Sequence, residues 1–178
     1  MRSGNQAHEE FLQATMGCMD LVYNIARRMV GSVEDAQDLV QETFLAAFRA
    51  WQDDRRPEKV EPWIATICLN LGRSMFRKRA RRPREVPLED QVLVLADTSN
   101  PERDALAALD RDALHAAMGR LPDEQCIALT LVDLGGLSTA EAASVMGTPR
   151  GTVLSRLHRG RRALALLLND DIPEMEVT

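Results

Sequence analysis

The chain has 178 residues, of which 45% are hydrophobic, 28% charged and 4% aromatic, and its net charge is −5. This composition excludes a disordered chain, and the lack of a membrane-length apolar run or an apolar leader predicts a cytoplasmic protein with no membrane insertion. Because Ala, Leu and Arg are abundant and no stretch alternates β-branched residues, we expect an all-α fold of one ordinary domain or two small ones.

Two amphipathic helices are predicted at the start of the chain. The first spans about residues 8–29 without a break, because apolar side chains recur at helical spacing, and Gly31 ends it. The second follows Ser32, an N-cap with Asp35 in the capping-box position. Its predicted buried face consists of Val33, Ala36, Leu39, Val40, Phe44, Ala47, Phe48 and Trp51. Its opposite face is polar and, on composition alone, is a solvated surface.

A third helix is predicted from Pro62, because proline suits a first helical turn. Its expected inner face consists of Trp63, Ile64, Ile67, Cys68, Leu71 and Met75. Trp63 is either a core residue or a platform for base stacking, and its apolar surroundings favour the core. Gly72 lies in mid-helix, where glycine costs about 1 kcal/mol relative to alanine.

Charge is distributed unevenly along the rest of the chain. Residues 73–84 carry seven basic and no acidic side chains, residues 85–133 eleven acidic and three basic, and residues 134–162 five basic and one acidic. Two basic patches separated by an acidic stretch predict two nucleic-acid contacts. Residues 84–101 are predicted to form a flexible acidic linker, whose extended reach of about 60 Å lets two domains occupy separate DNA elements.

The same order of charges predicts a compact free protein. Acidic side chains that are tethered close to the basic patches can pair with basic side chains in place of DNA phosphates, which makes the free chain compact. These ion pairs weaken as the salt concentration rises. The expected acidic members are Glu85, Glu89, Asp90 and Asp97, and the basic ones Arg77, Lys78, Arg79 and Arg81. The alternative is that the acidic stretch is a solvated spacer.

The C-terminal half is predicted to contain four helices, the first opening at residues 100–101 and the second at Pro122. Ser138 caps the third, Glu141 completes its capping box, and Gly147 ends it because glycine accepts positive φ. Pro149 opens the fourth helix, whose apolar face consists of Val153, Leu157, Leu164 and Leu168. The last two helices form either a plain hairpin or a helix-turn-helix that fits the DNA major groove.

The spacing of the cysteines and histidines does not predict a metal site or a disulfide framework. Cys18, Cys68 and Cys126 lack Cys-x-x-Cys spacing, and the three histidines are scattered. We therefore expect no metal site and no disulfide framework, with each cysteine acting as a small buried hydrophobe. The sequence offers no catalytic constellation and no phosphate-binding loop, so we expect neither an enzyme nor a cofactor.

Four stretches of the chain resemble one protein family. VEDAQDLVQETFLAAFRAW is similar to the second conserved region of sigma factors of the extracytoplasmic-function (ECF) type, subunits of bacterial RNA polymerase. LPDEQCIALTLVDLGGLS and GTVLSRLHRGRRAL resemble the fourth conserved region and its recognition helix. The resemblance covers about residues 10–168 and implies a region 2-like domain at 1–83, the linker at 84–101 and a region 4-like helix-turn-helix domain at 102–168. Residues 169–178 are expected to form a disordered tail.

The resemblance also implies function and contacts. It indicates a factor that binds core RNA polymerase, directs it to promoter DNA, helps melt the promoter and is held by an anti-sigma protein. The implied polymerase contacts are Asp38, Gln41, Glu42 and Arg49. The segment PWIATICLNLGRSMFRKRARR is similar to the segment that reads the minus-ten element, with Asn70, Arg73, Arg77, Lys78 and Arg79 as contacts. The minus-thirty-five contacts are Arg150, Thr152, Ser155, Arg156 and Arg159.

The chain departs from the family at four positions. Ser74 replaces an acidic residue, Gly72 lies in mid-helix, Cys126 replaces a basic residue and Leu154 a lysine. Leu154 is expected to point outward, where it weakens phosphate attraction and is available to a protein partner. Two rival functions stay open: an autonomous DNA-binding regulator with a helical dimerisation domain, and an adaptor that binds protein without binding DNA.

Overall fold

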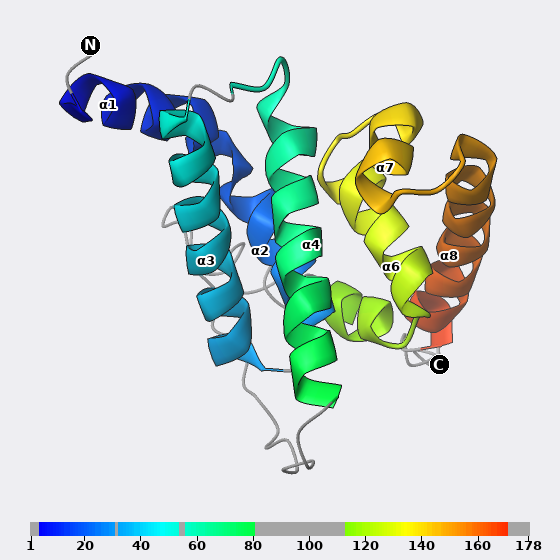
Figure 1. Cartoon of the computed structure of the whole chain (residues 1–178). Helices are drawn as coiled ribbons and strands as arrows, with labels where there is room; N and C mark the ends of the chain where they lie inside the picture. Colours follow the sequence, from blue (N-terminus) through cyan, green and yellow to red (C-terminus); the bar gives the residue numbers. More distant parts are fainter. Residues whose placement is uncertain (1–3, 31, 54–55, 81–112, 171–178) are drawn as a thin grey trace, which may run out of the picture.

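The computed structural model describes residues 4–30, 32–53, 56–80 and 113–170, and within these ranges every regular element is helical, as expected for an all-α protein. The elements are α1 (Gly4–Thr15), η1 (Met16–Cys18), α2 (Met19–Met29), α3 (Val33–Gln52), α4 (Val60–Ala80), a helical segment over 113–119, α6 (Asp123–Leu129), η2 (Thr130–Leu134), α7 (Thr139–Met146) and α8 (Arg150–Asp170) (Figure 1). No helix in these ranges is both long and apolar enough to cross a membrane.

The first group of helices, α1–α4, has its core where α2, α3 and α4 pack against one another. Ile25 of α2, Leu39 of α3 and Ile64 of α4 are almost completely buried there. The predicted N-cap of α3 is confirmed, because Ser32 Oγ accepts from Asp35 N at 3.1 Å. Thr43 is also buried although it is polar, since its hydroxyl donates to the Leu39 carbonyl at 2.6 Å.

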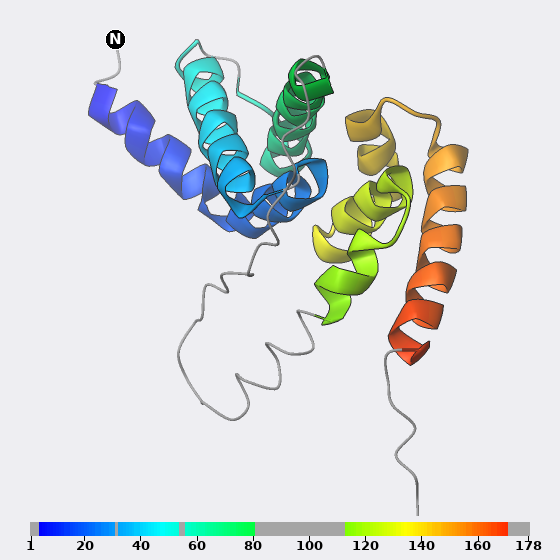
Figure 2. The same ribbon diagram turned by 90° about the horizontal axis from the view of Figure 1, so that it is seen from below.

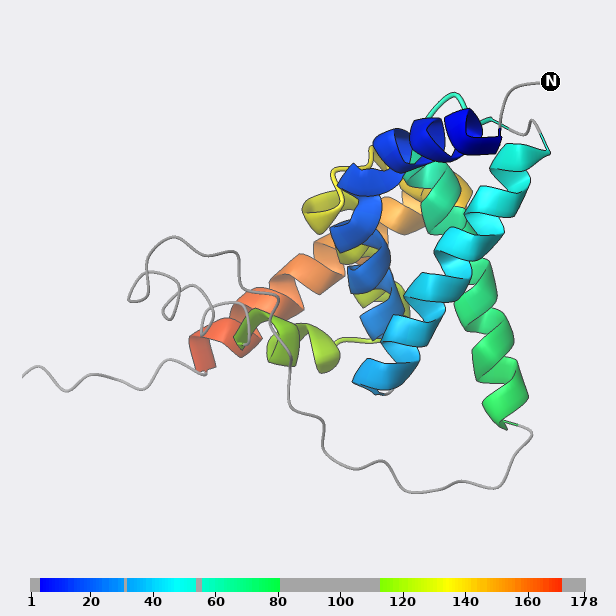
Figure 3. The same ribbon diagram turned by 90° about the vertical axis from the view of Figure 1, so that its left-hand side faces the viewer.

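The prediction of one continuous helix over residues 8–29 is wrong. The 3₁₀ turn η1 separates α1 from α2, and the two helices point in different directions (Figure 3). Buried Thr15 donates its hydroxyl to the Phe11 carbonyl at 2.8 Å, a bond that bends helices. Gly17 follows within the turn, where its low helix propensity favours the break. Apolar spacing continues through this break, so periodicity alone could not locate it.

Gly72 has a packing role in α4. A Cβ at this position would lie 2.9 Å from Met29 Cβ, closer than real Cβ contacts allow. The glycine therefore lets α4 and α2 approach each other closely, which explains a residue that helix propensity alone disfavours. The helix itself begins at Val60, two residues before Pro62.

The second group, α6–α8 with η2, contains the predicted helix-turn-helix. Ser138 and Glu141 form both hydrogen bonds of a capping box on α7, and Gly147 ends α7 with φ 66°. Val153 and Leu157 of α8 are buried, and Gly160 lies against Leu129 of α6. The final helix continues to Asp170, two residues into the predicted tail, because no proline or glycine interrupts it.

The two groups pack directly against each other. Helix α4 contacts α7, and α2 contacts both η2 and α6. A single cluster of buried side chains contains residues of both groups, and two views show them side by side (Figures 1 and 2). The predicted linker at 84–101, the helix start at 100–101 and the acidic residues expected to hold the protein compact lie outside the described residues.

Candidate nucleic-acid and polymerase interfaces

The outward face of α8 carries most of the residues expected to read the minus-thirty-five element. Arg150, Ser155 and Arg159 are exposed, and Thr152 is half-buried. Arg150 Nε donates to Thr139 Oγ1 at 2.9 Å, which links the start of α8 to the start of α7. Arg159 Nε donates to the Ser155 carbonyl of its own helix at 3.3 Å. These side chains therefore lie on the solvent side of a helix whose opposite face is fixed in the core.

Arg156 differs from its neighbours, because its side chain is only 18% exposed. Its Nη2 lies 2.8 Å from Glu124 Oε2 of α6, and its Nη1 donates to Thr148 Oγ1 at 3.5 Å. The arginine that we expect to contact bases is thus partly buried and paired within the protein. This pairing could not be predicted from local sequence patterns, since Glu124 lies 32 positions earlier in the chain.

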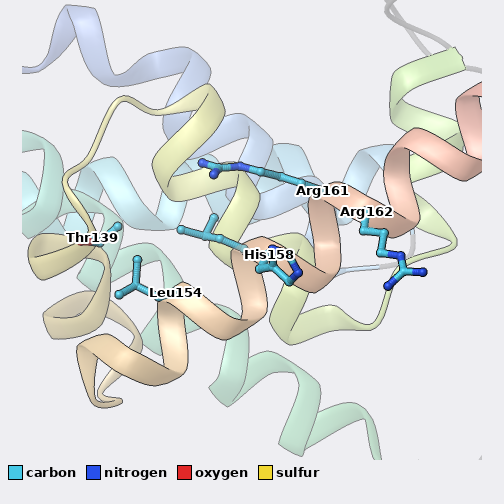
Figure 4. A pocket seen from close by; sticks show the side chains of 6 residues that line it. Thr139, Leu154, His158, Arg161 and Arg162 are labelled. Carbon is cyan, nitrogen blue, oxygen red and sulfur yellow. The ribbon is translucent and has the colours of Figure 1, made fainter.

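A shallow groove lies beside this face, between α8 and the start of α7 (Figure 4). Its lining combines apolar and basic side chains: Thr139, Leu154, Leu157, His158, Arg161 and Arg162. Arg161 donates to both carboxylate oxygens of Asp133, at 2.6 and 3.0 Å, which raises its pKa and fixes its guanidinium. Leu154 is 49% exposed, as expected from the sequence. The groove offers an apolar centre next to positive charge.

The predicted minus-ten residues on α4 lie in two different environments. Asn70 and Arg77 are exposed, whereas Arg73 is half-buried and donates from Nη2 to the Met146 carbonyl at the end of α7, at 3.3 Å. The structure therefore brings Arg73 to the turn that precedes α8. The side chains of Lys78 and Arg79 lie outside the described residues.

The four expected polymerase contacts share one exposed side of α3. Asp38, Gln41, Glu42 and Arg49 are all exposed. Leu45 lies among them and is 49% exposed. Leu45 was not predicted to belong to this face, although its position between Gln41 and Arg49 at helical spacing indicates that it does. Helix α3 lies on the side of the molecule away from α8 (Figures 1 and 3), so this face stays open while α4 is partly covered.

Trp63 and the cysteines belong to the core. Trp63 packs against the core cluster, with its ring centroid 6.3 Å from that of Trp51, which supports the core interpretation over base stacking. The three cysteines are free thiols and buried. Burial raises the pKa of Cys68 to about 11, so this thiol stays protonated and unreactive at neutral pH.

Comparisons with known proteins agree with this arrangement. Sigma-70 region 2 matches residues 17–82, and Sigma-70 region 4 matches residues 111–164. The ECF RNA polymerase sigma factor SigE of Mycolicibacterium smegmatis is 41% identical over 148 residues, which cover 82% of this chain and 56% of SigE. The ECF RNA polymerase sigma factor EcfG of Rhodopseudomonas palustris is 36% identical over 141 residues, which cover 79% of this chain and 75% of EcfG.

A solved structure has a similar fold over most of the chain's length. The sigma factor RpoE of Bartonella quintana, in complex with the anti-sigma factor NepR, superposes with a TM-score of 0.73 at 27% identity. The match covers 92% of this chain and 99% of RpoE. Both conserved regions, in the expected order, and relatives above 30% identity establish the family. The chain belongs to the ECF family of RNA polymerase sigma factors.

Proposed function

We propose that this protein binds core RNA polymerase, directs it to specific promoters and helps open the promoter DNA. The observation that carries the proposal is the presence, in one chain, of both conserved regions with a separate exposed face on each. The face of α3 is assigned to polymerase, and the outward face of α8 to the minus-thirty-five element. Helix α4, on which Asn70 and Arg77 are exposed, is assigned to the minus-ten element.

The chemistry of each face suits its assigned partner. Arginines on α8 and α4 neutralise phosphates and reach base edges, whereas Asp38 and Glu42 on α3 would repel DNA and instead attract a basic protein surface. The proposed role is one of binding and positioning, in the cytoplasm where polymerase and promoters lie, and the polymerase supplies the catalysis. We assign residues 1–83 and 102–168 to the two functional domains.

We further propose that an anti-sigma protein controls this factor. The support is the similarity to RpoE, whose solved structure contains the anti-sigma factor NepR. An anti-sigma protein that covers α3 would keep the factor from polymerase, and one that covers the DNA-facing helices would keep it from promoter DNA.

Run-off transcription with core polymerase over a set of genomic promoters tests the proposal. The expected result is promoter-specific transcription that requires the added factor. An autonomous regulator would instead bind duplex DNA tightly without polymerase in a gel-shift assay. An adaptor that binds no DNA would give no promoter-specific transcript. Either of these results would contradict the proposal.

A further inference from the structure

The groove beside α8 places an apolar side chain in the middle of the face assigned to DNA. Leu154 is 49% exposed and lies between Thr139 and His158 in this groove (Figure 4). From this arrangement we propose that Leu154 recognises a thymine of the minus-thirty-five element by contact with its C5 methyl group. Leu154 is then a specificity-determining residue. The inference rests on the proposed function, because it requires that α8 contacts promoter DNA.

The charge of α8 indicates which kind of molecule covers Leu154. Residues 150–169 contain five arginines and no acidic residue. The side chains of four of these arginines are exposed: Arg150, Arg159, Arg161 and Arg162. A face with this charge attracts the phosphates of DNA. When the phosphates pair with arginines on both sides of the leucine, a base edge covers the leucine itself.

The position of Leu154 along the helix also suits contact with a base. It is the fifth residue of α8, and the N-terminal residues of a recognition helix are those that contact base edges in the major groove. Gly151 lies three positions earlier on the same side of the helix, and even a Cβ placed there would meet open space. The surface next to Leu154 is therefore open to a base that approaches closely.

The surroundings of Leu154 hold it in a defined place. Val153 and Leu157 of the same helix are 0% and 2% exposed, so the core fixes the backbone that carries Leu154. At the rim of the groove, Arg161 donates to both carboxylate oxygens of Asp133. Because the helix and the rim are already fixed, little ordering is needed when DNA binds, and a single apolar contact can affect affinity.

The chemistry of leucine selects the base. Thymine carries a methyl group on its major-groove edge, whereas the edges of the other bases are distinguished there by hydrogen-bond donors and acceptors. The side chain of Leu154 has neither a donor nor an acceptor, so it recognises that methyl group and no polar pattern. Burial of one methyl group changes affinity about fourfold. The lysine that the family resemblance predicts at this position would instead bind phosphate or guanine.

Run-off transcription on modified promoters tests the inference with the full chain and core polymerase. Each thymine of the minus-thirty-five element, on either strand, is replaced in turn by uracil, which lacks only the C5 methyl group. At one position the wild type, kept below saturation, should lose about fourfold in transcription. Leu154→Ala should transcribe the thymine and uracil templates equally there. Leu166→Ala, at a 59% exposed leucine farther along α8, is the matched control and should keep the wild-type sensitivity.

A methylated cytosine gives the converse measurement. At the sensitive position, a cytosine is compared with 5-methylcytosine, which has the same pairing and charge. The wild type should transcribe the methylated template more strongly, and Leu154→Ala should transcribe both equally. The inference is overturned if no thymine methyl group affects transcription, or if its effect persists in Leu154→Ala. Absence of transcription from the unmodified promoter would instead contradict the proposed function, and the inference with it.

A charged variant tests independently whether Leu154 faces DNA. Leu154→Lys adds a phosphate contact, so the logarithm of promoter affinity of the polymerase complex should fall more steeply with the logarithm of salt, by a slope of about 0.9. Leu12→Lys adds the same charge at a 44% exposed leucine of α1 and should leave the slope unchanged. The alternative is that Leu154 binds a protein partner. An unchanged slope in Leu154→Lys would support this alternative and overturn the inference.

Discussion

Arg156 of α8 and Glu124 of α6 form an ion pair of 2.8 Å between Nη2 and Oε2, on the face expected to read promoter DNA. Glu124 is 53% exposed, so the arginine can exchange this carboxylate for DNA without unfolding the helix. An ion pair of this exposure contributes up to about 1 kcal/mol. A bidentate contact to guanine contributes about 1–3 kcal/mol, so DNA can outcompete Glu124.

Glu124→Gln should therefore increase promoter-specific run-off transcription up to about fivefold. DNA then no longer has to break the ion pair with Arg156, which contributes up to about 1 kcal/mol. Arg156→Ala should reduce transcription, and base changes in the minus-thirty-five element should then matter less than for the wild type. Asp133→Asn, which releases Arg161, is the matched control and should have a smaller effect. A decrease with Glu124→Gln would show that Glu124 orients Arg156 instead of competing with DNA.

Charge reversal at Asp38 or Glu42 should weaken binding to core polymerase and leave the fold intact. Both side chains are exposed on α3, so circular dichroism and the melting temperature should stay close to wild type. Glu9→Lys, on an exposed position of α1, is the matched control and should bind core normally. Normal core binding by the Asp38 and Glu42 variants would contradict the assignment of this α3 face to polymerase binding.

Leu45→Ala should also weaken core binding, although it removes no charge. The side chain is 49% exposed in the centre of the proposed polymerase face, where an apolar contact excludes water from neighbouring charges. The expected loss is about 1–2 kcal/mol of binding free energy, measured by titration of labelled protein with core. Leu12→Ala, at a 44% exposed leucine of α1, is the control. Equal effects at both positions would indicate general surface hydrophobicity.

Local signals in the sequence were sufficient for much of the fold. Ser32, Ser138 and Glu141 cap the helices that they were predicted to cap, and Gly147 has the expected positive φ. These features depend on a few neighbouring residues, so the sequence specifies them directly. The break at η1 was missed because it depends on a side-chain bond within a stretch whose apolar spacing continues.

Contacts between residues that are far apart in the chain could not be predicted from the sequence. The pairs Arg28 with His115 and Arg73 with Met146 join residues 87 and 73 positions apart, and charge patterns assign no partner at such distances. Arg73 and Arg156 were correctly placed on their helices, whereas their internal partners were not expected. The role of Gly72 could not be predicted either, since it depends on where Met29 lies in three dimensions.

Gly72→Ala should destabilise the protein, although alanine is the better helix former. A Cβ would lie 2.9 Å from Met29 Cβ and 3.0 Å from Met29 Cγ, so α2 and α4 must move apart. Overpacking costs about 1–3 kcal/mol, more than the gain of up to about 1 kcal/mol in helix propensity. Urea unfolding measures the difference. Gly151→Ala in α8, where a Cβ meets open space, is the control and should not destabilise. A stabilised Gly72→Ala protein would show that Met29 repacks freely.

Acid should weaken the contact between Lys59 and Glu141. The hydrogen bond from Lys59, together with those from Ser138, lowers the pKa of Glu141 to about 2 from its usual 4.5. A carboxylate whose pKa is lower in the folded state adds stability above pH 4.5, and this stability is lost as pH falls toward 2. Glu141→Gln keeps an oxygen that can cap α7 but cannot titrate, so its melting temperature should fall less than that of the wild type between pH 5.5 and about 3. Glu9→Gln, an exposed glutamate of α1, should keep the wild-type slope. If Glu141→Gln loses as much stability as the wild type over this interval, the carboxylate of Glu141 does not stabilise the folded chain.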